Sequence, residues 1–385
     1  MLSYGVIAGL ERMCLPVLFK EISTDLGLNP VSIGTIWGLD PLAGVLIGLP
    51  GGLLADRFGL KRTLTVVCLL AGVFSALRGF STNFLTLAVS VFLFGFVAAM
   101  TPSVAPKTTA VWFSGRHLGL ANALLQFSWY IGSIIATMLS ATTLSPLLGG
   151  WRNVLFLLAA PAIVAGILWL TTGREPDKSE LPAASVSTVP FRQAFSRVIR
   201  MKEVWLIGLV QLTIFGSNTG FMGYLPLYLR NIGWTTMAAD SAVTVYNAAS
   251  MIGIIPMVLL ASRLRVKKEV IIFSVIMGFM CMGLLPFMKG NSVFMLLIIG
   301  GFLRSAAAPL CAILIFENKE VGSTYGGTAT GLASTTGMFG AFVAPPLGNS
   351  LTSISAGAPF IFWAILAAIA LPIIPFIKGR AQATY

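Results

Sequence analysis

The sequence predicts an all-α integral membrane protein in which twelve membrane-spanning helices form two six-helix bundles. Of its 385 residues, 56% are hydrophobic and 10% are charged, whereas soluble domains are about 25% charged. Its apolar stretches reach the roughly 20 residues that a helix needs to cross the hydrocarbon core of a bilayer. Lysine and arginine outnumber the acids by 25 to 13, and they gather on alternate loops. This composition excludes a soluble enzyme, a nucleic-acid-binding domain and a secreted disulfide scaffold.

Hydropathy, interrupted by charges, glycines and prolines, places the spans in order along the chain. The first span begins next to Met1 and carries Glu11 and Arg12 in its middle, so we expect a structural helix and no removable signal peptide. The four cysteines each stand alone in an apolar stretch, and there is one histidine, which predicts buried free thiols and no metal site. The expected spans are 2–22, 31–55, 63–80, 83–106, 118–144, 152–172, 203–229, 239–262, 269–288, 291–316, 326–352 and 358–377.

A polar stretch divides these spans into two sets of six. We therefore expect an N-terminal bundle at 1–172, a cytoplasmic linker at 173–202 and a C-terminal bundle at 203–385. Eighteen basic residues fall on the loops that share the side of this linker, and five fall on the opposite loops. Because cytoplasmic loops are enriched in lysine and arginine, both termini are predicted to be cytoplasmic. The five opposite residues are Lys20, Arg78, Arg152, Arg230 and Lys289.

An internal repeat becomes visible when the two halves are shifted by 206 residues. The segment 50–62 then lies over 256–268 with six identities, and the Gly-Phe pair at 95–96 lies over the one at 301–302. The shift places the second span on the eighth and the fourth on the tenth. It therefore predicts two parallel repeats that are related by an axis along the membrane normal.

The loop between the second and third spans carries a motif, GLLADRFGLKR at 52–62. A glycine at 59 suits a tight reversal, and the acid at 56 stands at a helix end, where it can meet the N-terminal dipole of another helix. The motif resembles the G-x-L-a-D-r-x-G-r-k signature of the major facilitator superfamily, with Leu60 where the family usually has Arg. The resemblance implies the major facilitator fold and a latch that joins the cytoplasmic ends of the two halves while the cavity is open outward. The latch residues would be Gly52, Asp56, Arg57, Gly59, Lys61 and Arg62.

A second, narrower resemblance concerns the first helix and the segment after the fourth span. The residues that carry it are Leu10-Glu11-Arg12, Leu15-Pro16 and Lys107-x4-Trp112-Phe113-x2-Arg116-x2-Gly119-x-Ala121-Asn122. This pattern is similar to that of the anion:cation symporter group within the superfamily, whose members carry organic acids. The resemblance places the group's acid-arginine pair on Glu11 and Arg12. Ala98 and Ala99 stand where the fourth span of many members has an acid.

Arg12 and Arg304 are the two cations expected near mid-membrane. Arg12 lies about 17 Å along its helix from Met1 at 1.5 Å per residue, and a charge at that depth costs about 2.5–3.5 kcal/mol. Because a guanidinium makes paired hydrogen bonds to a carboxylate, we expect both arginines to bind an anionic substrate. The resemblance implies that they lie on opposite walls of a central cavity lined by spans 1, 4, 7 and 10. The alternatives are structural pairs, of Arg12 with Glu11 and of Arg304 with Asp40 or Glu11.

Two acids and a set of polar residues complete the candidate site. Glu11 and Asp40 are candidates for carrying a coupled proton, because burial disfavours the charged form of a carboxyl group. Asp40 could equally be the partner of an arginine, or reach the outer headgroups because Pro41 follows it. Polar and aromatic residues expected to line the cavity are Gln126, Trp129, Tyr130, Gln211, Asn218, Tyr224, Asn247, Thr335 and Thr336.

These features predict a secondary active transporter that moves a small organic anion, a monocarboxylate or sugar acid, across the cytoplasmic membrane by alternating access. We expect symport with H⁺, with Na⁺ as the alternative ion, because no nucleotide-binding P-loop is present. We expect no enzyme activity and no cofactor. Membrane lipids surround the protein, nucleic acid is no partner, and the chain is expected to be a monomer. The alternatives are an efflux antiporter for drugs or metabolites with the same fold, and a transporter-like sensor without net flux.

Overall fold

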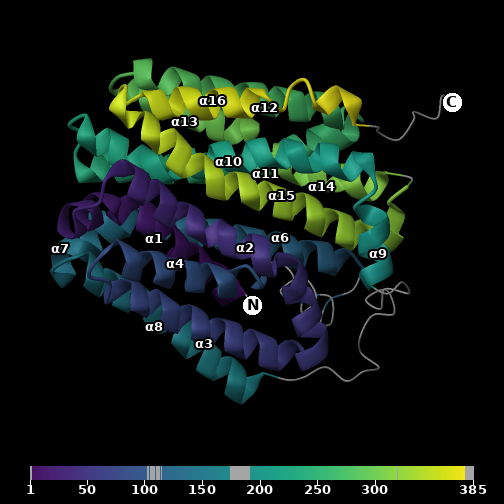
Figure 1. Ribbon diagram of the computed structural model, residues 1–385, viewed down its shortest axis with the longest axis horizontal. Coiled ribbons are helices and arrows are strands. Elements are labelled where there is room, and N and C mark those ends of the chain that lie inside the picture. The colour runs from purple at the N-terminus through teal and green to yellow at the C-terminus, as the bar shows by residue number, and fades with distance from the viewer. Residues whose placement is uncertain are drawn as a thin grey trace. The chain divides into compact units, whose positions relative to one another are not determined.

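The computed structural model describes residues 2–101, 104, 109, 113, 115–173, 191–318 and 320–377, and the regular elements in these ranges are helical (Figure 1). The elements before residue 174 are α1 (Leu2–Leu26), α2 (Pro30–Phe58), α3 (Leu60–Gly79), α4 (Phe84–Ala98), α6 (Gly115–Leu139), the π-helix η1 (Ser140–Leu144), α7 (Ser145–Leu148) and α8 (Trp151–Thr172). Those after residue 190 are α9 (Phe191–Val198), α10 (Lys202–Asn231), α11 (Thr236–Arg263), α12 (Lys267–Leu284), η3 (Leu285–Phe287), α13 (Asn291–Arg304), α14 (Ala307–Glu317), α15 (Gly322–Ser350), η4 (Leu351–Ser353), α16 (Ala358–Ala368) and η5 (Ile374–Phe376).

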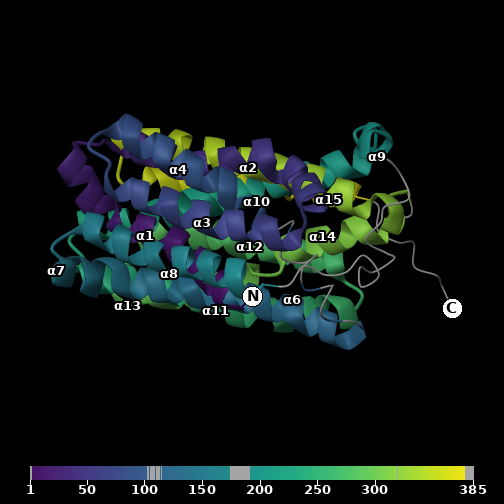
Figure 2. The ribbon, with the colours of Figure 1, turned by 90° about the horizontal axis from the view of Figure 1, so that it is seen from below.

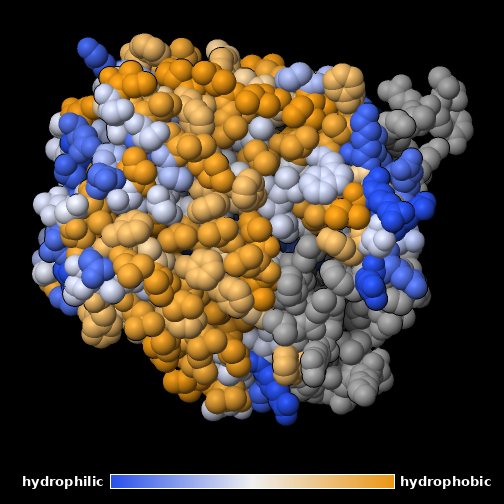
Figure 3. Space-filling model, viewed as in Figure 1, coloured by the Kyte–Doolittle hydropathy of each residue, from blue (hydrophilic) through white to orange (hydrophobic). Residues whose placement is uncertain are grey.

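The helices have the length and the surface of membrane spans. Within the described residues, eight helical segments are long and apolar enough to cross a bilayer, and α4 and α16 are shorter apolar helices. Hydrophobic side chains cover most of the face seen in Figure 3, and hydrophilic residues gather at its left and right edges. The expectation of an all-α fold with several membrane spans is confirmed. The count of twelve spans stays a prediction.

Local sequence signals explain where several helices begin. Asn29 precedes α2, and its side chain accepts a hydrogen bond of 2.8 Å from the Ser32 amide, while Pro30 supplies a preset φ at the first helical position. Asn83 and Thr86 form a reciprocal capping box at the start of α4. Gly59, in the expected latch motif, separates α2 from α3 and has a φ of 85°. That angle is strained for any residue with a Cβ atom, which explains the glycine at this reversal.

The tenth expected span is interrupted. Hydropathy predicts one helix over 291–316, but α13 ends at Arg304 and α14 begins at Ala307. The physical reason is Pro309, which has no amide hydrogen to donate to the Ser305 carbonyl and whose ring clashes with it. The break follows directly after the mid-membrane arginine.

The chain divides into two compact units. Unit 1 comprises Met1–Val186 and Met222–Thr244, and unit 2 comprises Ser187–Phe221 and Val245–Tyr385. In unit 1, α3 packs on α8, α1 on α6 and α2 on α4. In unit 2, α12 packs on α16, α13 and α14, and α9 lies beside α15 (Figure 1, Figure 2). The division into bundles at 1–172 and 203–385 stays a prediction.

Glycines permit the close contact between α1 and α6. A Cβ atom on Gly132 would lie 1.9 Å from the carbonyl oxygen of Val6, and one on Gly9 would lie 2.2 Å from that of Trp129. Small residues let helix backbones approach closely, which favours van der Waals packing between helices in lipid. The four cysteines are free and buried as expected.

Helix boundaries recur at the spacing found in the sequence. The starts of α2 and α11, residues 30 and 236, are 206 apart, and the ends of α4 and α13, residues 98 and 304, are also 206 apart. The starts of α3 and α12, of α6 and α15, and of α8 and α16 each differ by 207.

A packing contact recurs at the same spacing. A Cβ atom on Gly95 would lie 2.6 Å from the Cα atom of Asp40, and one on Gly301 would lie 2.7 Å from the carbonyl oxygen of Tyr246. Both members of this contact are therefore displaced by 206 residues.

Candidate functional site

In unit 1, Arg12 of α1 forms an ion pair with Asp40 of α2. The Nε atom of Arg12 lies 2.6 Å from Oδ2 of Asp40, and the two side chains are 36% and 8% exposed. The guanidinium also lies 6.0 Å from the ring centroid of Trp37, within reach of a cation–π interaction. Asp40 is therefore buried beside an arginine, and Gly95 of α4 packs against its backbone.

Glu11 is adjacent to Arg12 in sequence but faces Arg78. An Arg78 Nη1 hydrogen donates to the backbone carbonyl of Glu11 at 2.9 Å, and Nη2 donates to the hydroxyl of Ser75. Successive residues point about 100° apart on an α-helix, so these two neighbouring charges reach different partners.

The expectation that Arg78 lies in a loop is wrong. It stands in the last turn of α3, is fully buried, and has its guanidinium 4.2 Å from the ring centroid of Phe94. The signal that could have found it is its position two residues before the end of the span predicted at 63–80. A buried glutamate in the first span also required a cationic or polar partner.

In unit 2, Arg304 lies at the end of α13 and contacts neutral groups. Its Nη1 atom donates to the hydroxyl of Tyr246 at 2.5 Å, and this hydroxyl donates to Oδ1 of Asn218 at 3.1 Å. Within the described residues, Arg304 has no carboxylate at ion-pair distance. Arg304 also borders a void of about the size of one water molecule, whose other lining residues include Ser217, Ser274 and Gly278.

Two polar contacts, Arg12–Asp40 and Asn218–Tyr246, lie at positions that differ by 206 residues, the spacing of the sequence repeat. Arg12 shifted by 206 is Asn218, and Asp40 shifted by 206 is Tyr246. In the first half, Arg12 and Asp40 form an ion pair. In the second half, Tyr246 and Asn218 form a neutral hydrogen bond. Arg304 shifts back onto Ala98, so the extra cation belongs to the second half alone.

The other candidate residues have varied environments. Gln211 and Asn247 are buried, and within the described structure Oε1 of the former and Nδ2 of the latter have no hydrogen-bond partner. Tyr224 is buried with its ring 6.0 Å from that of Tyr228. The remaining candidates comprise the exposed Gln126, the edge-to-face pair Trp129 and Tyr130, and Thr335 and Thr336, whose hydroxyls bond to carbonyls of their own helix.

The latch motif is only partly described. Lys61 is half-buried and Arg62 is exposed in the first turn of α3. The environment of Gly52 and the side chains of Asp56 and Arg57 lie outside what the structure describes, as do the side chains of Lys107, Trp112 and Arg116 from the second pattern. The latch therefore stays a prediction.

Sequence reasoning also missed a buried cluster in unit 1, here called the Arg230 cluster and made of Arg230, Asp240, Thr142 and Val17. Arg230, expected in a loop, lies in the last turn of α10 and forms an ion pair with Asp240 of α11; the side chains are 7% and 1% exposed. The Thr142 hydroxyl donates to Asp240 at 2.8 Å, and Arg230 donates to the Val17 carbonyl at 2.6 Å. The signal was present, because Asp240 falls within the span predicted at 239–262.

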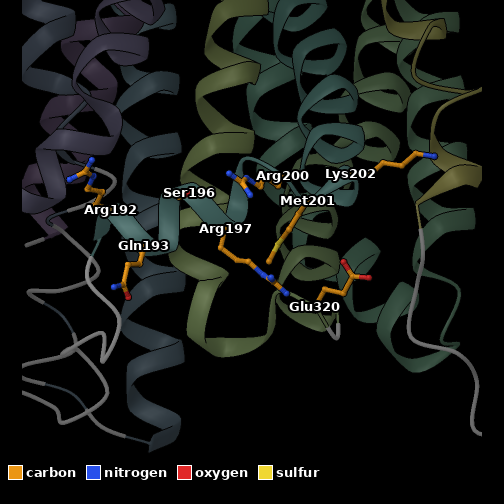
Figure 4. Close-up of a pocket in the computed structure, with 8 residues that line it drawn as sticks. All are labelled: Arg192, Gln193, Ser196, Arg197, Arg200, Met201, Lys202 and Glu320. Atoms are coloured by element: carbon orange, nitrogen blue, oxygen red, sulfur yellow. The ribbon is translucent and has the colours of Figure 1, made fainter.

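Basic residues line a surface groove in unit 2, around α9 and the first residue of α10. Figure 4 shows side chains from α9 and the start of α10 around it, with one acid opposite. Its volume is about 820 Å³, and its lining residues are Arg192, Gln193, Ser196, Arg197, Arg200, Met201, Lys202 and Glu320. These belong mostly to the stretch predicted as a basic linker at 173–202, and none is a predicted substrate contact.

Comparisons with known proteins find transporters among the relatives of this chain. The sialic acid transporter NanX of Escherichia coli is 24% identical over 350 residues, which cover 90% of this chain and 84% of that protein. The probable galactarate/D-glucarate transporter GudP of Escherichia coli is 26% identical over 205 residues. That match covers 50% of this chain and 43% of GudP, so the chain aligns with less than half the length of this relative.

Solved structures share the fold. The nucleoside transporter NupG superposes with a TM-score of 0.78 at 14% identity, covering 98% of this chain and 99% of that one. A bacterial homologue of the human lysosomal transporter Spinster superposes with a TM-score of 0.76 at 13% identity, covering 98% and 95%. At these identities the likeness concerns the fold alone.

A protein-family model identifies the family of the chain. The model of the Major Facilitator Superfamily matches residues 1–239, which is more than half of the 385 residues. The relatives named are transporters, which confirms the expectation that this multi-pass membrane protein is not an enzyme. The chain belongs to the Major Facilitator Superfamily.

Proposed function

We propose that this protein is a secondary active transporter that moves a small organic anion, a monocarboxylate or sugar acid, across the cytoplasmic membrane. The observation that carries the proposal is Arg304, a cation within a membrane-spanning segment whose hydrogen-bond partner in the described structure is the neutral Tyr246. A guanidinium is costly at this depth, and a substrate carboxylate would use its remaining donors. Arg12, with 36% of its side chain exposed, is the second proposed contact.

The architecture we propose is twelve spans in two parallel repeats, with both termini cytoplasmic. The recurrence of helix boundaries at 206 or 207 residues supports the repeat. Families built in this way work by alternating access around a site near the membrane midplane. The loop-charge asymmetry, 18 basic residues against 5, supports the orientation. We propose that the transporter acts as a monomer.

The substrate class is supported by the relatives and by the chemistry of the clusters. NanX is named as a sialic acid transporter and GudP as a probable galactarate/D-glucarate transporter, and these substrates are hydroxylated acids. Gln211, Asn218, Tyr246 and Asn247 offer amide and hydroxyl groups of the kind that bind substrate hydroxyls.

We propose coupling to H⁺, with Asp40 and Glu11 as the residues that carry the proton. Both are buried carboxyl groups next to an arginine. Substrate binding to Arg12 would compete with Asp40 for the same guanidinium, which would link the proton to the substrate.

The test is uptake by purified protein in proteoliposomes. We expect accumulation of radiolabelled sugar acid or monocarboxylate driven by an inward H⁺ gradient, with alkalinisation of an unbuffered exterior and inhibition by an uncoupler. Uptake that follows a Na⁺ gradient and ignores the uncoupler would replace H⁺ by Na⁺. Binding of acids without flux would indicate a sensor, and resistance to lipophilic drugs without acid uptake would indicate an efflux antiporter.

A further inference from the structure

We infer that the basic groove of unit 2 binds the headgroup of an anionic phospholipid, at a site separate from the proposed substrate contacts. The groove surrounds α9 and the start of α10 and has a volume of about 820 Å³. Binding sites for small molecules measure about 300–1,000 Å³, so the groove has room for a headgroup. The inference does not depend on which substrate the protein carries.

The helix that carries most of the groove is held against the core of unit 2. α9 is amphipathic: Ala194 and Val198 are buried, and Phe195 packs against the hydrophobic core of the unit. The helix also packs on α15. The amide of Met201 donates to the Val198 carbonyl at 3.0 Å, which closes the turn after α9. The groove is therefore formed before a ligand arrives, and binding has little backbone to order.

The opposite face of α9 and the turn that follows supply the charge of the groove. Arg192 and Arg197 are exposed on this face, Arg200 is exposed in the turn, and Lys202 is the first residue of α10. In the view of Figure 4, Arg197 and Arg200 lie between Arg192 and Lys202. Glu320 is the acid among the described lining residues. Four cations and one acid give this lining a formal charge of +3.

The charge of the groove is not cancelled by the described part of the protein. Within the described residues, none of the four cations has a carboxylate at ion-pair distance. Glu317, three residues before Glu320, pairs with Lys267. Like charges that share one groove repel each other, and a cleft lined by one sign of charge attracts the opposite ion. An anion in the groove would relieve this repulsion.

The groove lies where a membrane span begins. Lys202 starts α10, which is long and apolar enough to cross a bilayer. Trp205 and Ile199 are exposed, and the indole of Trp205 donates to the Ile199 carbonyl at 2.8 Å. Tryptophan is enriched at the level of the lipid headgroups. Exposed apolar side chains and a basic groove thus share one short turn, which suits a lipid with acyl chains and an anionic headgroup.

The chemistry of the lining favours a phosphate group. An arginine guanidinium makes paired hydrogen bonds to phosphate oxygens, and clusters of lysine and arginine next to a membrane-spanning helix bind anionic lipids. A zwitterionic headgroup is disfavoured, because its ammonium group would meet the same cations. The ligand class is therefore an anionic phospholipid, such as phosphatidylglycerol or cardiolipin. A free phosphate ester shares this chemistry, and the experiment separates the two sources.

The test measures lipid binding to the purified full-length protein. Phosphatidylglycerol, cardiolipin, phosphatidylcholine and phosphatidylethanolamine are added in detergent, and the bound lipids are counted by native mass spectrometry. We expect the anionic lipids to bind at least about tenfold more tightly than the zwitterionic ones, since each basic residue near an anionic lipid strengthens binding by about fivefold. Inorganic phosphate and glycerol 3-phosphate are tested separately, by their effect on the melting temperature.

A matched pair of double variants locates the site. Arg197→Gln with Arg200→Gln removes two exposed arginines from the groove. Arg263→Gln with Arg265→Gln removes two exposed arginines from the end of α11 and the turn that follows it. The groove variant should bind phosphatidylglycerol about tenfold or more weakly than the wild type, and the control should bind it unchanged. Because both variants lose the same charge, a difference between them identifies a site.

Equal weakening by the two double variants overturns the inference, because general attraction to the protein would then explain the binding. Equal affinity for phosphatidylglycerol and phosphatidylcholine also overturns it. If the soluble phosphates raise the melting temperature of the wild type alone and the lipids show no preference, the occupant is a free phosphate ester and the lipid site is wrong. If the groove variant does not elute as folded protein, Arg192→Gln with Lys202→Gln replaces it, with the same expectation.

Discussion

The Nε atom of Arg12 lies 2.6 Å from Oδ2 of Asp40, an ion pair that joins α1 to α2. The equivalent positions in the second half, Asn218 and Tyr246, make a neutral hydrogen bond of 3.1 Å that joins α10 to α11. At positions that differ by 206 residues, a polar contact between two helices thus occurs twice, once between charged side chains and once between neutral ones. Arg304, whose hydrogen-bond partner among the described residues is the neutral Tyr246, lies in the second half.

Replacement of Arg304 by Ala should abolish transport and leave folding intact. The side chain hydrogen-bonds to Tyr246 but to no charged group in the described structure, so its loss strands no ion. The measurements are uptake of a labelled acid in proteoliposomes and the elution profile of the detergent-solubilised protein. The control is Arg263→Ala at the exposed end of α11, which should transport normally. Wild-type uptake by Arg304→Ala would remove Arg304 from the site.

Removal of Asp40 alone should destabilise the protein more than removal of Asp40 and Arg12 together. The single change leaves Arg12 without its acid, whereas the double change removes both charges. Because Arg12 is 36% exposed, we expect Asp40→Ala to lower the free energy of unfolding by about 2 kcal/mol. This lies between the values for exposed and for buried ion pairs. Thermal unfolding of the two single variants and the double variant in detergent measures the coupling. Additive effects of the two changes would show that the pair contributes nothing.

The Arg230–Asp240 pair should matter more for stability than the Arg152–Asp25 pair. The first is 7% and 1% exposed and the second 38% and 43%. Asp240→Ala leaves a buried arginine without its carboxylate and should lower the free energy of unfolding by about 3–5 kcal/mol. Asp25→Ala should lower it by at most about 1 kcal/mol. Melting temperatures of the two variants in the same detergent test the difference, and equal shifts would contradict the burial of the Arg230 cluster.

Alanine at Gly132 should separate α1 from α6 and lower the melting temperature. Its Cβ atom would lie 1.9 Å from the backbone oxygen of Val6, and this clash requires one helix to move. We expect the free energy of unfolding to fall by about 1–3 kcal/mol.

The matched control for Gly132→Ala is Gly327→Ala in α15, where nothing lies within 4 Å of the added Cβ atom. There the higher helix propensity of alanine should stabilise by about 0.5–1 kcal/mol. The comparison fails if the two variants shift the melting temperature in the same direction.

Hydropathy alone predicted much of the helical layout, because a bilayer requires long apolar segments with internally satisfied backbones. The repeat spacing of 206 residues also emerged from the sequence, and with it the correspondence between Asp40 and Tyr246. The break after Arg304 was missed, although Pro309 marks it, because hydropathy averages over a window and ignores the hydrogen bond that proline removes.

The sequence by itself determined that charges stand inside the membrane, since Glu11, Arg12, Asp40 and Arg304 interrupt apolar runs. Only the tertiary structure decided their neighbours: Arg12 pairs with Asp40, Arg304 hydrogen-bonds to Tyr246, and Arg78 hydrogen-bonds to the backbone carbonyl of Glu11. These partners lie 28 to 67 residues apart, on different helices. A helix turns about 100° per residue, so the partner of a side chain depends on which faces of two helices meet. Those faces are set by helix packing, such as the close approach of Gly95 to the backbone of Asp40.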